Sequence, residues 1–426
     1  MPSVVVVGAQ WGDEGKGKIV DLLARDARLV VRFQGGGNAG HTLVIDGKTT
    51  ILHLIPSGST RKGMHGACSG YEVLDLELLI QELEIAKVCG SNVMIDFKAP
   101  VVLQVHKDID VGRENSRGAK KIGTTKSGIG PAYEDFISRR GIQVGDLVSE
   151  DRIREKLTCG SYYEERCATA RMHCVNTSPS LEECVAQLIK LAPSILPHLG
   201  DTSVLVNKFR QEGMVLFEGA QGMMLCVHNG TQPYITSSFC SPYIALAQYG
   251  QNFDRVVGVL KAYLTRVGSG PMPTELLGQD GDDLREAGAE FGATTGRPRR
   301  CAWLDLVQAG YSVRRGGITE LAVTKLDVLS GRRIIKVCVK YKMPDGTIIT
   351  PGSNVTLTTE LMEVAKPIYR DMPGWQQDIS GIRDARKLPS EVMTYLGLIS
   401  AELGIPVTIL SNGAGRNQRI ELREAA

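Results

Sequence analysis

Four consecutive valines, Val4 to Val7, run directly into a glycine-rich segment, and this junction most constrains how the chain can fold. An unbroken apolar run of this length predicts a strand that is buried on both faces, as in a parallel sheet. From Ile19 onward the apolar residues recur with helical spacing, so a helix is expected to follow. A strand, a glycine-rich turn and a helix in this order present backbone N–H groups and the positive end of the helix dipole to an anion. The start of the chain therefore predicts an α/β fold with an anion site.

The turn fits the pattern of a phosphate-binding loop, with Gly12, Gly17 and Lys18 at the expected spacing. It departs from the pattern at Ile19, which stands where a Ser or Thr would hold magnesium. Asp13 is the candidate for the missing metal ligand, because a carboxylate among phosphates needs a cation or a proton beside it. Its presence predicts chemistry as well as binding. A turn that only packs a helix against a strand is the weaker interpretation of a segment so rich in glycine and lysine.

Predicted strands alternate with predicted helices along the chain. Strands are expected at 29–33, 43–45, 50–52, 93–95, 101–103, 214–217, 255–261, 320–324, 334–339 and 407–410, and Asp46-Gly47 predicts a type I′ hairpin between two of them. Helices are expected after an N-cap at Asp75, from near Trp303, and over 390–403. The pattern predicts a large, mostly parallel twisted sheet flanked by helices. Without a linker to divide it, the chain is expected to form a single domain over 1–426, with a helical subdomain at about 148–200.

Composition excludes several classes of function. Lys and Arg number 49 against 47 Asp and Glu, so no excess of charge indicates binding to nucleic acid or to an anionic membrane. No apolar run approaches the length of a membrane span, and no signal sequence is evident, so a cytoplasmic location is expected. The ten cysteines include no Cys-x-x-Cys pair and are predicted to be reduced and mostly buried. Cys167, His173 and Cys174 are close in sequence but are predicted to lie on a helix surface rather than to bind zinc.

Polar, glycine-rich segments follow several predicted strands, which is where open α/β sheets bind their ligands. The first of them, 34–42, carries consecutive glycines that let a ligand approach the backbone closely. Its His41 is predicted to act as an acid or as a donor to a phosphate, and a purely structural histidine is the alternative. Further segments of this kind are 120–131, 218–222 and 292–300.

Two segments carry groups that select a ligand. Thr324 to Asp327 resembles the guanine-reading motif of GTP-binding proteins. A carboxylate there accepts hydrogen bonds from N1–H and from the 2-amino group of guanine, which adenine does not offer. In 292–300, Arg297, Arg299 and Arg300 can pair bidentately with carboxylates or phosphates, and a solvated basic turn is the alternative.

Over essentially its full length the chain resembles the adenylosuccinate synthetase family. The matching segments are GAQWGDEGKGK, QGGGNAGHT, IGTTKSGIGPAYED followed by RRG, FEGAQG, KAYLTRVGSGPMPTEL, FGATTGRPRR, TKLDVL and GWQQDISGIRD. Members of this family join L-aspartate to IMP with GTP and magnesium. The γ-phosphate passes to O6 of IMP, giving 6-phosphoryl-IMP, and the aspartate amine then displaces it. The resemblance thus implies a cytoplasmic, homodimeric ligase of purine biosynthesis that yields adenylosuccinate, GDP and phosphate.

The resemblance also implies the role of each matching residue. Asp13 would take the N1 proton of IMP and, with the carbonyl of Gly40, hold Mg²⁺; His41 would act as the acid near the bridging oxygen of GTP. The implied GTP site comprises Gly12, Asp13, Glu14, Gly15, Lys16, Gly17, Lys18, Gly40, His41, Thr42, Arg299, Lys325, Leu326, Asp327, Ser411, Asn412 and Gly413. The implied IMP site comprises Asp13, Glu14, Gly15, Lys16, Asn38, Ala39, Gly40, His41, Thr125, Gln221, Thr236 and Arg297, with Arg139 from the partner subunit. The implied aspartate site comprises Ala293, Thr294, Thr295, Gly296, Arg297, Pro298 and Arg299.

The departures from the family pattern cluster on the acceptor-nucleotide side. The usual Thr-Thr-Gly-Arg-Gly is Thr124 to Gly128 here, so an arginine near the nucleotide is missing or is replaced by Lys126. The other departures are His228-Asn229 for Asp-His, Phe239-Cys240 for Asn-Thr, Cys68-Ser69-Gly70-Tyr71-Glu72 for Gly-Asn-Gly-Val-Val, and Ala414 for proline.

These departures leave two alternatives. One is the same chemistry on another acceptor, such as dGMP in a 2-aminoadenine pathway or a specialised metabolite. Relatives that use dGMP tend to carry Ser at the position of Asp13, so Asp13 argues against that acceptor. The other alternative is a GTP-binding regulator without ligase activity, against which the presence of both Asp13 and His41 argues.

Overall fold

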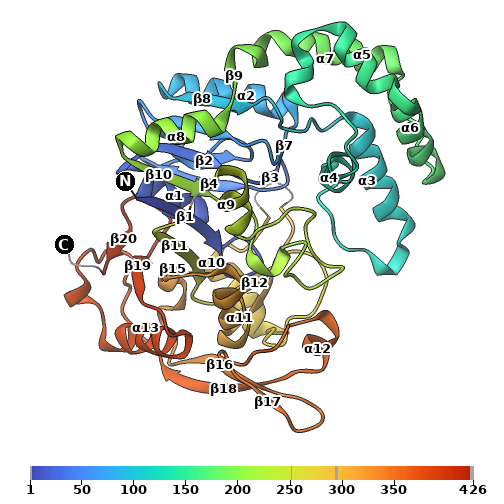
Figure 1. Cartoon of the computed structure of the whole chain (residues 1–426). Coiled ribbons are helices and arrows are strands. Elements are labelled where there is room, and N and C mark those ends of the chain that lie inside the picture. The colour runs from blue at the N-terminus through green and yellow to red at the C-terminus, as the bar shows by residue number, and fades with distance from the viewer. Residues whose placement is uncertain (1, 251, 293–295, 423–426) are drawn as a thin grey trace.

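The strand that contains the four valines, β1 (Ser3–Gly8), lies in the middle of a ten-stranded sheet (Figure 1). The computed structural model describes residues 2–250, 252–292 and 296–422. Both neighbours of β1, β10 (Met214–Glu218) and β11 (Arg255–Lys261), run parallel to it. Every residue of β1 is buried, as the apolar run predicts for a strand covered on both faces.

The sheet extends in both directions from this centre. Beyond β10 come β2 (Ala27–Arg32), β6 (His65–Cys68), β8 (Asn92–Asp96) and β9 (Leu199–Gly200), and beyond β11 come β15 (Glu320–Thr324), β19 (Val407–Ser411) and β20 (Arg419–Glu421). All its pairings are parallel except that of β19 with β20. The predicted α/β fold with a large, mostly parallel sheet is confirmed.

Helices cover both faces of this sheet because successive valines of β1 point in opposite directions. Val4 and Val6 pack in one hydrophobic cluster with Ile19 of α1 (Lys16–Ala24). Val5 and Val7 pack in another cluster on the opposite face. The helices that contribute to this second cluster are α8 (Thr202–Glu212), α9 (Tyr243–Tyr249), α10 (Gln279–Gly288), α11 (Leu306–Gly316) and α13 (Ser390–Leu403).

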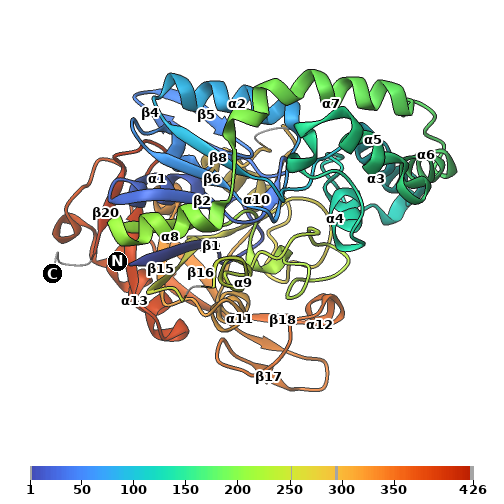
Figure 2. The ribbon, with the colours of Figure 1, turned by 45° about the horizontal axis from the view of Figure 1, so that its top comes forward.

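Further helices gather beyond the β8 end of the sheet (Figures 1 and 2). They are α2 (Leu76–Val88), α3 (Gln104–Ser116), α4 (Ile129–Ile137), α5 (Glu150–Thr158), α6 (Tyr162–Met172) and α7 (Leu181–Ile195). All except α4 share one hydrophobic cluster with β8. The helical character predicted for 148–200 is confirmed, although the helical region begins earlier, at α3. Its status as a subdomain stays a prediction.

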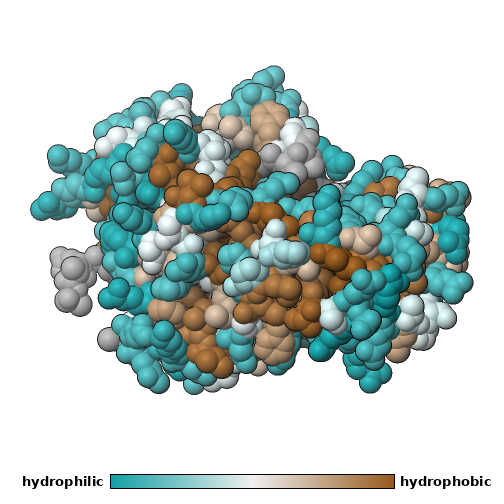
Figure 3. Space-filling view, turned by 90° about the horizontal axis from the view of Figure 1, so that it is seen from above, coloured by the Kyte–Doolittle hydropathy of each residue, from teal (hydrophilic) through white to brown (hydrophobic). Residues whose placement is uncertain are grey.

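Smaller sheets complete the fold. A four-stranded sheet contains β14 (Leu304–Asp305), β16 (Ile334–Lys342), β17 (Ile348–Ile349) and β18 (Lys366–Pro373), and α12 (Thr359–Val364) precedes β18. Three two-stranded sheets pair β3 (Gly35–Gly36) with β7 (Glu72–Val73), β4 (His41–Ile45) with β5 (Lys48–Leu52), and β12 (Leu264–Arg266) with β13 (Arg300–Ala302). Seen from above, hydrophobic side chains gather over the middle of the molecule and hydrophilic ones over its margins (Figure 3).

Several local predictions can be compared with the structure. Asp46 and Gly47 both have positive φ angles, as a type I′ hairpin requires, and the Asp75 carboxylate accepts a hydrogen bond from the Leu78 N–H as an N-cap. The strand predicted at 101–103 is wrong: only an isolated bridge at Val101 forms before α3 begins. The helix predicted near Trp303 starts instead at Leu306, because β13 and β14 intervene and Asp305 caps the helix.

The state of the cysteines and the character of the helices can be compared with the predictions from composition. All ten cysteines are free thiols, and six of them are buried, as predicted. Among the helices of the described ranges, none combines the length and the apolar character needed to cross a membrane.

Candidate active site

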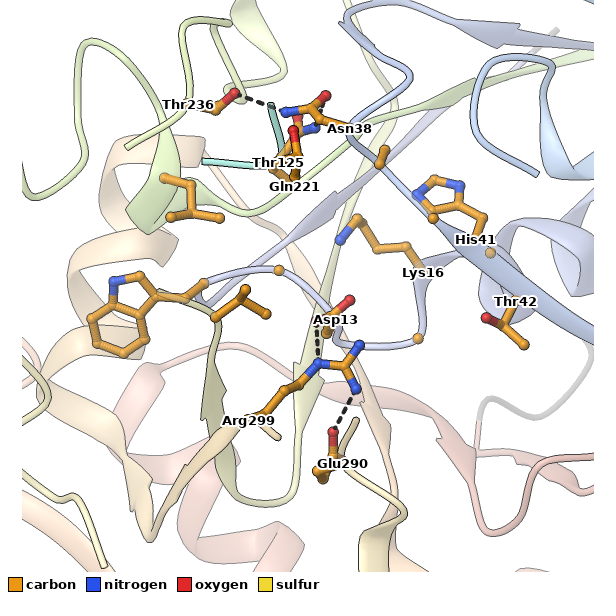
Figure 4. A pocket seen from close by; sticks show the side chains of 18 of the residues that line it. Asp13, Lys16, Asn38, His41, Thr42, Thr125, Gln221, Thr236, Glu290 and Arg299 are labelled. Carbon is orange, nitrogen blue, oxygen red and sulfur yellow. Dashed lines mark hydrogen bonds and ion pairs between the residues drawn. The ribbon is translucent and has the colours of Figure 1, made fainter. Parts of the chain in front are cut away.

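A cavity of about 900 Å³ opens at the carboxyl ends of the parallel strands (Figure 4). The loops that follow β1, β2, β10, β15 and β19 all contribute to its wall. The predicted GTP-site and IMP-site residues that line it are Gly12, Asp13, Gly15, Lys16, Gly17, Lys18, Asn38, Ala39, Gly40, His41, Thr42, Thr125, Gln221, Thr236, Arg299, Lys325, Asp327, Ser411 and Gly413. The structure therefore brings together most of the residues that lie far apart in the sequence.

The glycine-rich loop after β1 is shaped from beneath by Glu14. This fully buried carboxylate accepts hydrogen bonds from the backbone N–H groups of Gln10 (3.1 Å) and Gly12 (2.9 Å) and from Nζ of Lys16 (2.6 Å). Glu14 does not line the cavity, and its predicted contact with the nucleotides stays a prediction. Asp13, by contrast, is exposed to the cavity and adopts a positive φ of 58°, which is uncommon for a residue other than glycine.

Asp13 is held by an arginine from the far side of the cavity (Figure 4). Nε of Arg299 lies 2.6 Å from Oδ2 of Asp13. The Nη1 of the same guanidinium lies 3.4 Å from Oε2 of Glu290. Arg299 thus neutralises the carboxylate of Asp13, and Glu290 orients the arginine.

Glu290 is the buried centre of a charged network that the sequence did not reveal. Its Oε1 accepts hydrogen bonds from Lys261 Nζ (2.9 Å) and Tyr263 OH (2.6 Å), and Lys325 Nζ lies 3.6 Å away. Burial alone would raise the pKa of Glu290, but Lys261 and Lys325 lower it to about 2. Glu290 therefore stays ionised and joins the arginine on Asp13 to the lysine at the predicted guanine site.

At the end of the cavity where guanine is predicted to bind, which we call the guanine end, the carboxylate of Asp327 has an unsatisfied acceptor oxygen. Oδ1 of Asp327 is buried and has no hydrogen-bond partner among the described residues. Burial raises the pKa of Asp327, with Lys325 and Lys18 acting in the opposite direction. A buried acceptor without a partner is costly, so this carboxylate is suited to a ligand that donates hydrogen bonds.

The wall beside Asp327 is fastened to the helix of the glycine-rich loop. Lys18 Nζ donates to Ser411 Oγ (2.8 Å) and to the carbonyls of Gly413 (2.6 Å) and Gln418 (2.8 Å). Burial lowers the pKa of Lys18 to about 8, although Asp327 opposes the shift. Two other predicted GTP-site residues, Leu326 and Asn412, are buried behind the wall. Asn412 donates to the carbonyls of Ile379 (2.6 Å) and Ile382 (2.8 Å), so it holds the loop rather than facing the cavity.

His41 lines the cavity and is backed by a buried carboxylate. Its Nδ1 forms a short hydrogen bond with Oε1 of Glu218, which also accepts from Oγ of Ser57 (2.7 Å). Burial lowers the pKa of His41 and Arg32 adds to this effect, while Glu218 opposes it. Within the described ranges no residue bonds to Nε2, so this nitrogen is available to a ligand. The sequence placed Glu218 in a glycine-rich segment, but only the fold shows that it orients His41.

Neutral groups form the opposite end of the cavity. Nε2 of Gln221 donates to Oδ1 of Asn38 (3.0 Å), and Nδ2 of Asn38 donates to Oγ1 of Thr236 (3.4 Å). Thr125 lines the same end (Figure 4). Of the described residues on 123–130 and 221–237 that line the cavity, none is cationic. The predicted IMP phosphate site therefore has amide and hydroxyl groups but no arginine or lysine of its own on these segments.

Several predicted residues are not part of this wall. Arg139 is exposed, has a φ of 64° and does not line the cavity. Gly296, Arg297 and Pro298 are exposed and likewise lie outside the wall. Ala293, Thr294 and Thr295 lie outside the described residues.

Most residues that depart from the family pattern lie outside the cavity wall. Tyr71, His228 and Phe239 do not line the cavity; the ring centre of Phe239 is 6.2 Å from that of Tyr71 and 6.4 Å from that of His228. We call these three residues the aromatic layer. Lys126 is also outside the wall, whereas Ala414 lines it. The groups that would touch the acceptor nucleotide are thus largely unaltered.

The chain is similar to known proteins along nearly its whole length. The model of the family described as adenylosuccinate synthetase matches residues 5–420. The chain is 44% identical over 430 residues to adenylosuccinate synthetase of Marinomonas sp. (strain MWYL1), with 99% of this chain and 98% of the relative covered. It is also 44% identical over 433 residues to adenylosuccinate synthetase of Neisseria meningitidis serogroup B, with 99% of this chain and 98% of the relative covered.

Two solved structures are similar as well. Fully ligated adenylosuccinate synthetase from Plasmodium falciparum matches with a TM-score of 0.92 and 34% identity, covering 99% of each chain. The succinoaminodeoxyadenylate synthetase of cyanophage S-2L, bound to dGMP and dATP, matches with a TM-score of 0.63 and 20% identity, covering 99% of this chain and 96% of that one. The second likeness extends to the fold alone.

Proposed function

The chain belongs to the adenylosuccinate synthetase family, and from this premise we propose how its residues join L-aspartate to IMP. The reaction consumes GTP and yields adenylosuccinate, GDP and phosphate, through 6-phosphoryl-IMP. The protein is accordingly a ligase of purine biosynthesis. One observation carries the assignment of residues: a carboxylate inside the phosphate loop, Asp13, faces a cavity with an unpaired acceptor, Asp327, at one end and neutral amides at the other.

The donor nucleotide would lie along the charged side of the cavity. Asp327 would accept from N1–H and the 2-amino group of guanine, and Ser411 and Gly413 would border the ring. Lys16, Lys18 and the N–H groups of the glycine-rich loop would contact the phosphates, because a helix N-terminus and ammonium groups both favour anions. Nε2 of His41 would donate to the bridging oxygen beside the γ-phosphate. The charge of the phosphates would raise the pKa of His41 and so supply the proton for this bond.

The acceptor nucleotide would occupy the neutral end. Asn38, Thr125 and Thr236 would hold its phosphate, and Gln221 would face the base. Asp13 would take the N1 proton, which makes O6 nucleophilic towards the γ-phosphate. Arg299 pairs with Oδ2 of Asp13, so Oδ1 would be the oxygen that accepts this proton.

The oxygen ligands at this point suit Mg²⁺. The exposed carboxylate of Asp13 and the backbone carbonyl of Gly40 both line the cavity, and hard oxygen ligands of this kind are the ones that Mg²⁺ prefers. When bound, Mg²⁺ would neutralise the charge on the phosphates. We propose that residues 293 to 299 close over L-aspartate, with Arg297 and Arg299 pairing with its carboxylates.

The identity of the acceptor is tested by phosphate release with GTP and aspartate across IMP, dIMP, GMP and dGMP. We expect IMP to give the highest kcat/KM, because the altered aromatic layer does not reach the cavity. A higher kcat/KM for dGMP would reassign the acceptor, and phosphate release that is independent of aspartate would remove the ligase step.

We further propose that the enzyme is a homodimer in which Arg139 completes the neighbouring subunit's site. The neutral groups at the acceptor end leave the charge of a nucleotide phosphate without a cation, and an exposed arginine outside its own cavity could supply one. Arg139→Leu should raise the KM for IMP about tenfold to a hundredfold, as loss of a bidentate charged hydrogen bond implies, with less effect on GTP.

Complementation makes the shared site testable. Arg139→Leu mixed with Asp13→Ala should form hybrid dimers that have one intact site. At an IMP concentration too low to support either parent alone, the mixture should therefore recover part of the activity. If mass spectrometry demonstrates that subunits have exchanged and the mixture still stays inactive, Arg139 serves its own subunit.

We also propose a cytoplasmic location. All ten cysteines are free thiols, which fits a reducing compartment.

A further inference from the structure

A second hollow lies at the edge of the sheet opposite the active site. It has a volume of about 620 Å³ and opens where β2 and β6 begin, whereas the active-site cavity opens where the parallel strands end. Its charged lining residues are Arg25, Arg28, Arg61, Lys62, Arg416 and Glu212. We call it the basic hollow. The chain as a whole carries a net charge of only +2, so five cationic side chains around one hollow do not reflect the overall composition.

The basic hollow contains cations that no carboxylate neutralises. Arg28 and Lys62 are exposed and have no ion-pair or hydrogen-bond partner among the described residues. They come from separate parts of the chain, the start of β2 and the turn before β6. Cations held close together repel one another, and an anion between them relieves that repulsion. The floor is formed by His65 and Phe209, whose ring centres lie 4.6 Å apart.

Two further cations are fixed in position at the same place. The buried carboxylate of Asp21 accepts two hydrogen bonds from Arg416, both of 2.7 Å, and lies 3.0 Å from Nε of Arg61. One carboxylate shared by two guanidinium groups leaves a net positive charge and N–H groups in a fixed orientation. The basic hollow is thus partly ordered before any ligand arrives.

We propose that the basic hollow binds an oligophosphate anion, either an inorganic chain or the phosphate chain of a nucleotide. Guanidinium forks match phosphate oxygens bidentately, and a chain of several phosphates carries enough charge to engage cations from three separate segments. A single phosphate ion would reach only part of a hollow of this size. The binding of this anion goes beyond the ligase activity and does not depend on it, whereas its effect on GTP, argued next, rests on the proposed function.

The position of Arg416 links the basic hollow to the guanine end of the active site. The helix α1 and the segment 411–418 meet twice: through Lys18, which bonds to Ser411, Gly413 and Gln418, and one helical turn further on through Asp21 and Arg416. An anion that draws Arg416 away from Asp21 would shift this segment against α1. Occupation of the basic hollow should therefore change the affinity for GTP.

Calorimetric titration with inorganic tripolyphosphate tests the assignment on the full-length protein saturated with GDP and IMP. We expect one equivalent to bind, and Arg28→Ala/Lys62→Ala to weaken that binding at least tenfold, since each charged hydrogen bond contributes on the order of 1.5–3 kcal/mol. The matched control is Lys156→Ala/Lys190→Ala, which removes two exposed lysines from the helices α5 and α7. Equal loss in both double variants, or no binding to the wild type, would overturn the proposal.

Further measurements distinguish a nucleotide from an inorganic phosphate chain as the ligand and test the effect of binding on GTP. ATP in place of tripolyphosphate should bind at least tenfold more tightly if the natural ligand is a nucleotide, and no more tightly if it is an inorganic chain. Tripolyphosphate should shift the KM for GTP about fivefold in the wild type, a usual size for coupling between two sites, and not in Arg28→Ala/Lys62→Ala. Neither residue belongs to the proposed catalytic site, so activity without tripolyphosphate should be unchanged. Binding without any shift in KM would overturn the link to the guanine end.

Discussion

The two ends of the active-site cavity are built from different kinds of groups. At the donor end, Asp327, Lys325, Glu290 and Arg299 form a charged network that is largely fixed before a ligand binds. At the acceptor end, Asn38, Gln221 and Thr236 form a chain of neutral hydrogen bonds. If GTP and IMP bind as proposed, the triphosphate would meet cations of its own subunit, whereas the IMP phosphate would need a counter-charge from outside the segments 123–130 and 221–237. This difference is what the proposed shared site predicts: a donor end built by one chain and an acceptor end that needs Arg139 of the partner subunit.

The largest effect is expected at Asp13, where the two ends meet. Asp13→Ala should lower kcat by about a thousandfold or more, because general-base catalysis and a metal ligand are lost together. GTP should still bind, since Lys16, Lys18 and the loop N–H groups remain. Single-turnover phosphate release with a parallel nucleotide-binding assay checks this. Near-normal turnover of Asp13→Ala would mean that Asp13 is neither the general base nor an essential metal ligand.

The donor end is tested next through its unpaired acceptor. Asp327→Asn should lower kcat/KM for GTP about a hundredfold, because two hydrogen bonds to a charged group are weakened. The variant should gain activity with xanthosine triphosphate, which offers an oxygen where guanine has an amino group. In the wild type, ATP should support little turnover. Equal use of ATP and GTP by the wild type would show that the donor end does not select the base.

Replacing Glu290, the buried centre of the charged network, should have a smaller effect on kcat/KM than replacing Asp327, and it should also affect stability. Glu290→Gln should lower kcat/KM for GTP about tenfold to thirtyfold and also reduce the melting temperature, since Lys261, Lys325 and Arg299 lose a shared, buried counter-charge. The matched control is Glu275→Gln, which removes the carboxylate paired with Arg300 outside the cavity wall. If both variants lose kcat/KM equally, Glu290 only stabilises the fold and the donor end is not organised around it.

The smallest effect is expected behind the acceptor end. Phe239→Asn restores the residue usual in the family, yet it should change the KM for IMP by less than about threefold, because residue 239 does not line the cavity and single contacts away from the wall are usually small. Steady-state kinetics with IMP and dGMP give the comparison. A change in the preference between IMP and dGMP in this variant would mean that the aromatic layer influences which acceptor nucleotide binds, although it does not line the cavity.

The sequence was sufficient for the central fold but not for its periphery. The four valines of β1 predict a doubly covered strand, since neither face can be exposed, and the repeated strand–helix pattern then leaves few arrangements other than a parallel sheet. The short strands β13 and β14 were missed because they pair only with distant partners, β12 and β16, and carry no periodic pattern of their own. The strand predicted at 101–103 was wrong because this apolar run is buried by packing and has no partner strand in the described part of the chain.

The same division holds for the active site. Loop residues such as Asp13, Lys18 and Asp327 could be predicted because their chemistry is set by local spacing. Glu14, Leu326 and Asn412 stand in those same loops, but their side chains face the protein interior, and only the packing decides this. Glu218 and Glu290 act on His41 and Arg299 from segments far away in the sequence, so no local pattern could have revealed them.

The bonds from Lys18 to Ser411, Gly413 and Gln418 join the helix after β1 to the segment after β19. Synthesis reaches the loop after β1 long before the segment after β19, because Lys18 and Ser411 lie 393 positions apart. A nascent chain that still lacks this segment therefore lacks one wall of the cavity. A ligand in the completed cavity would touch both segments and so hold together two distant parts of the chain.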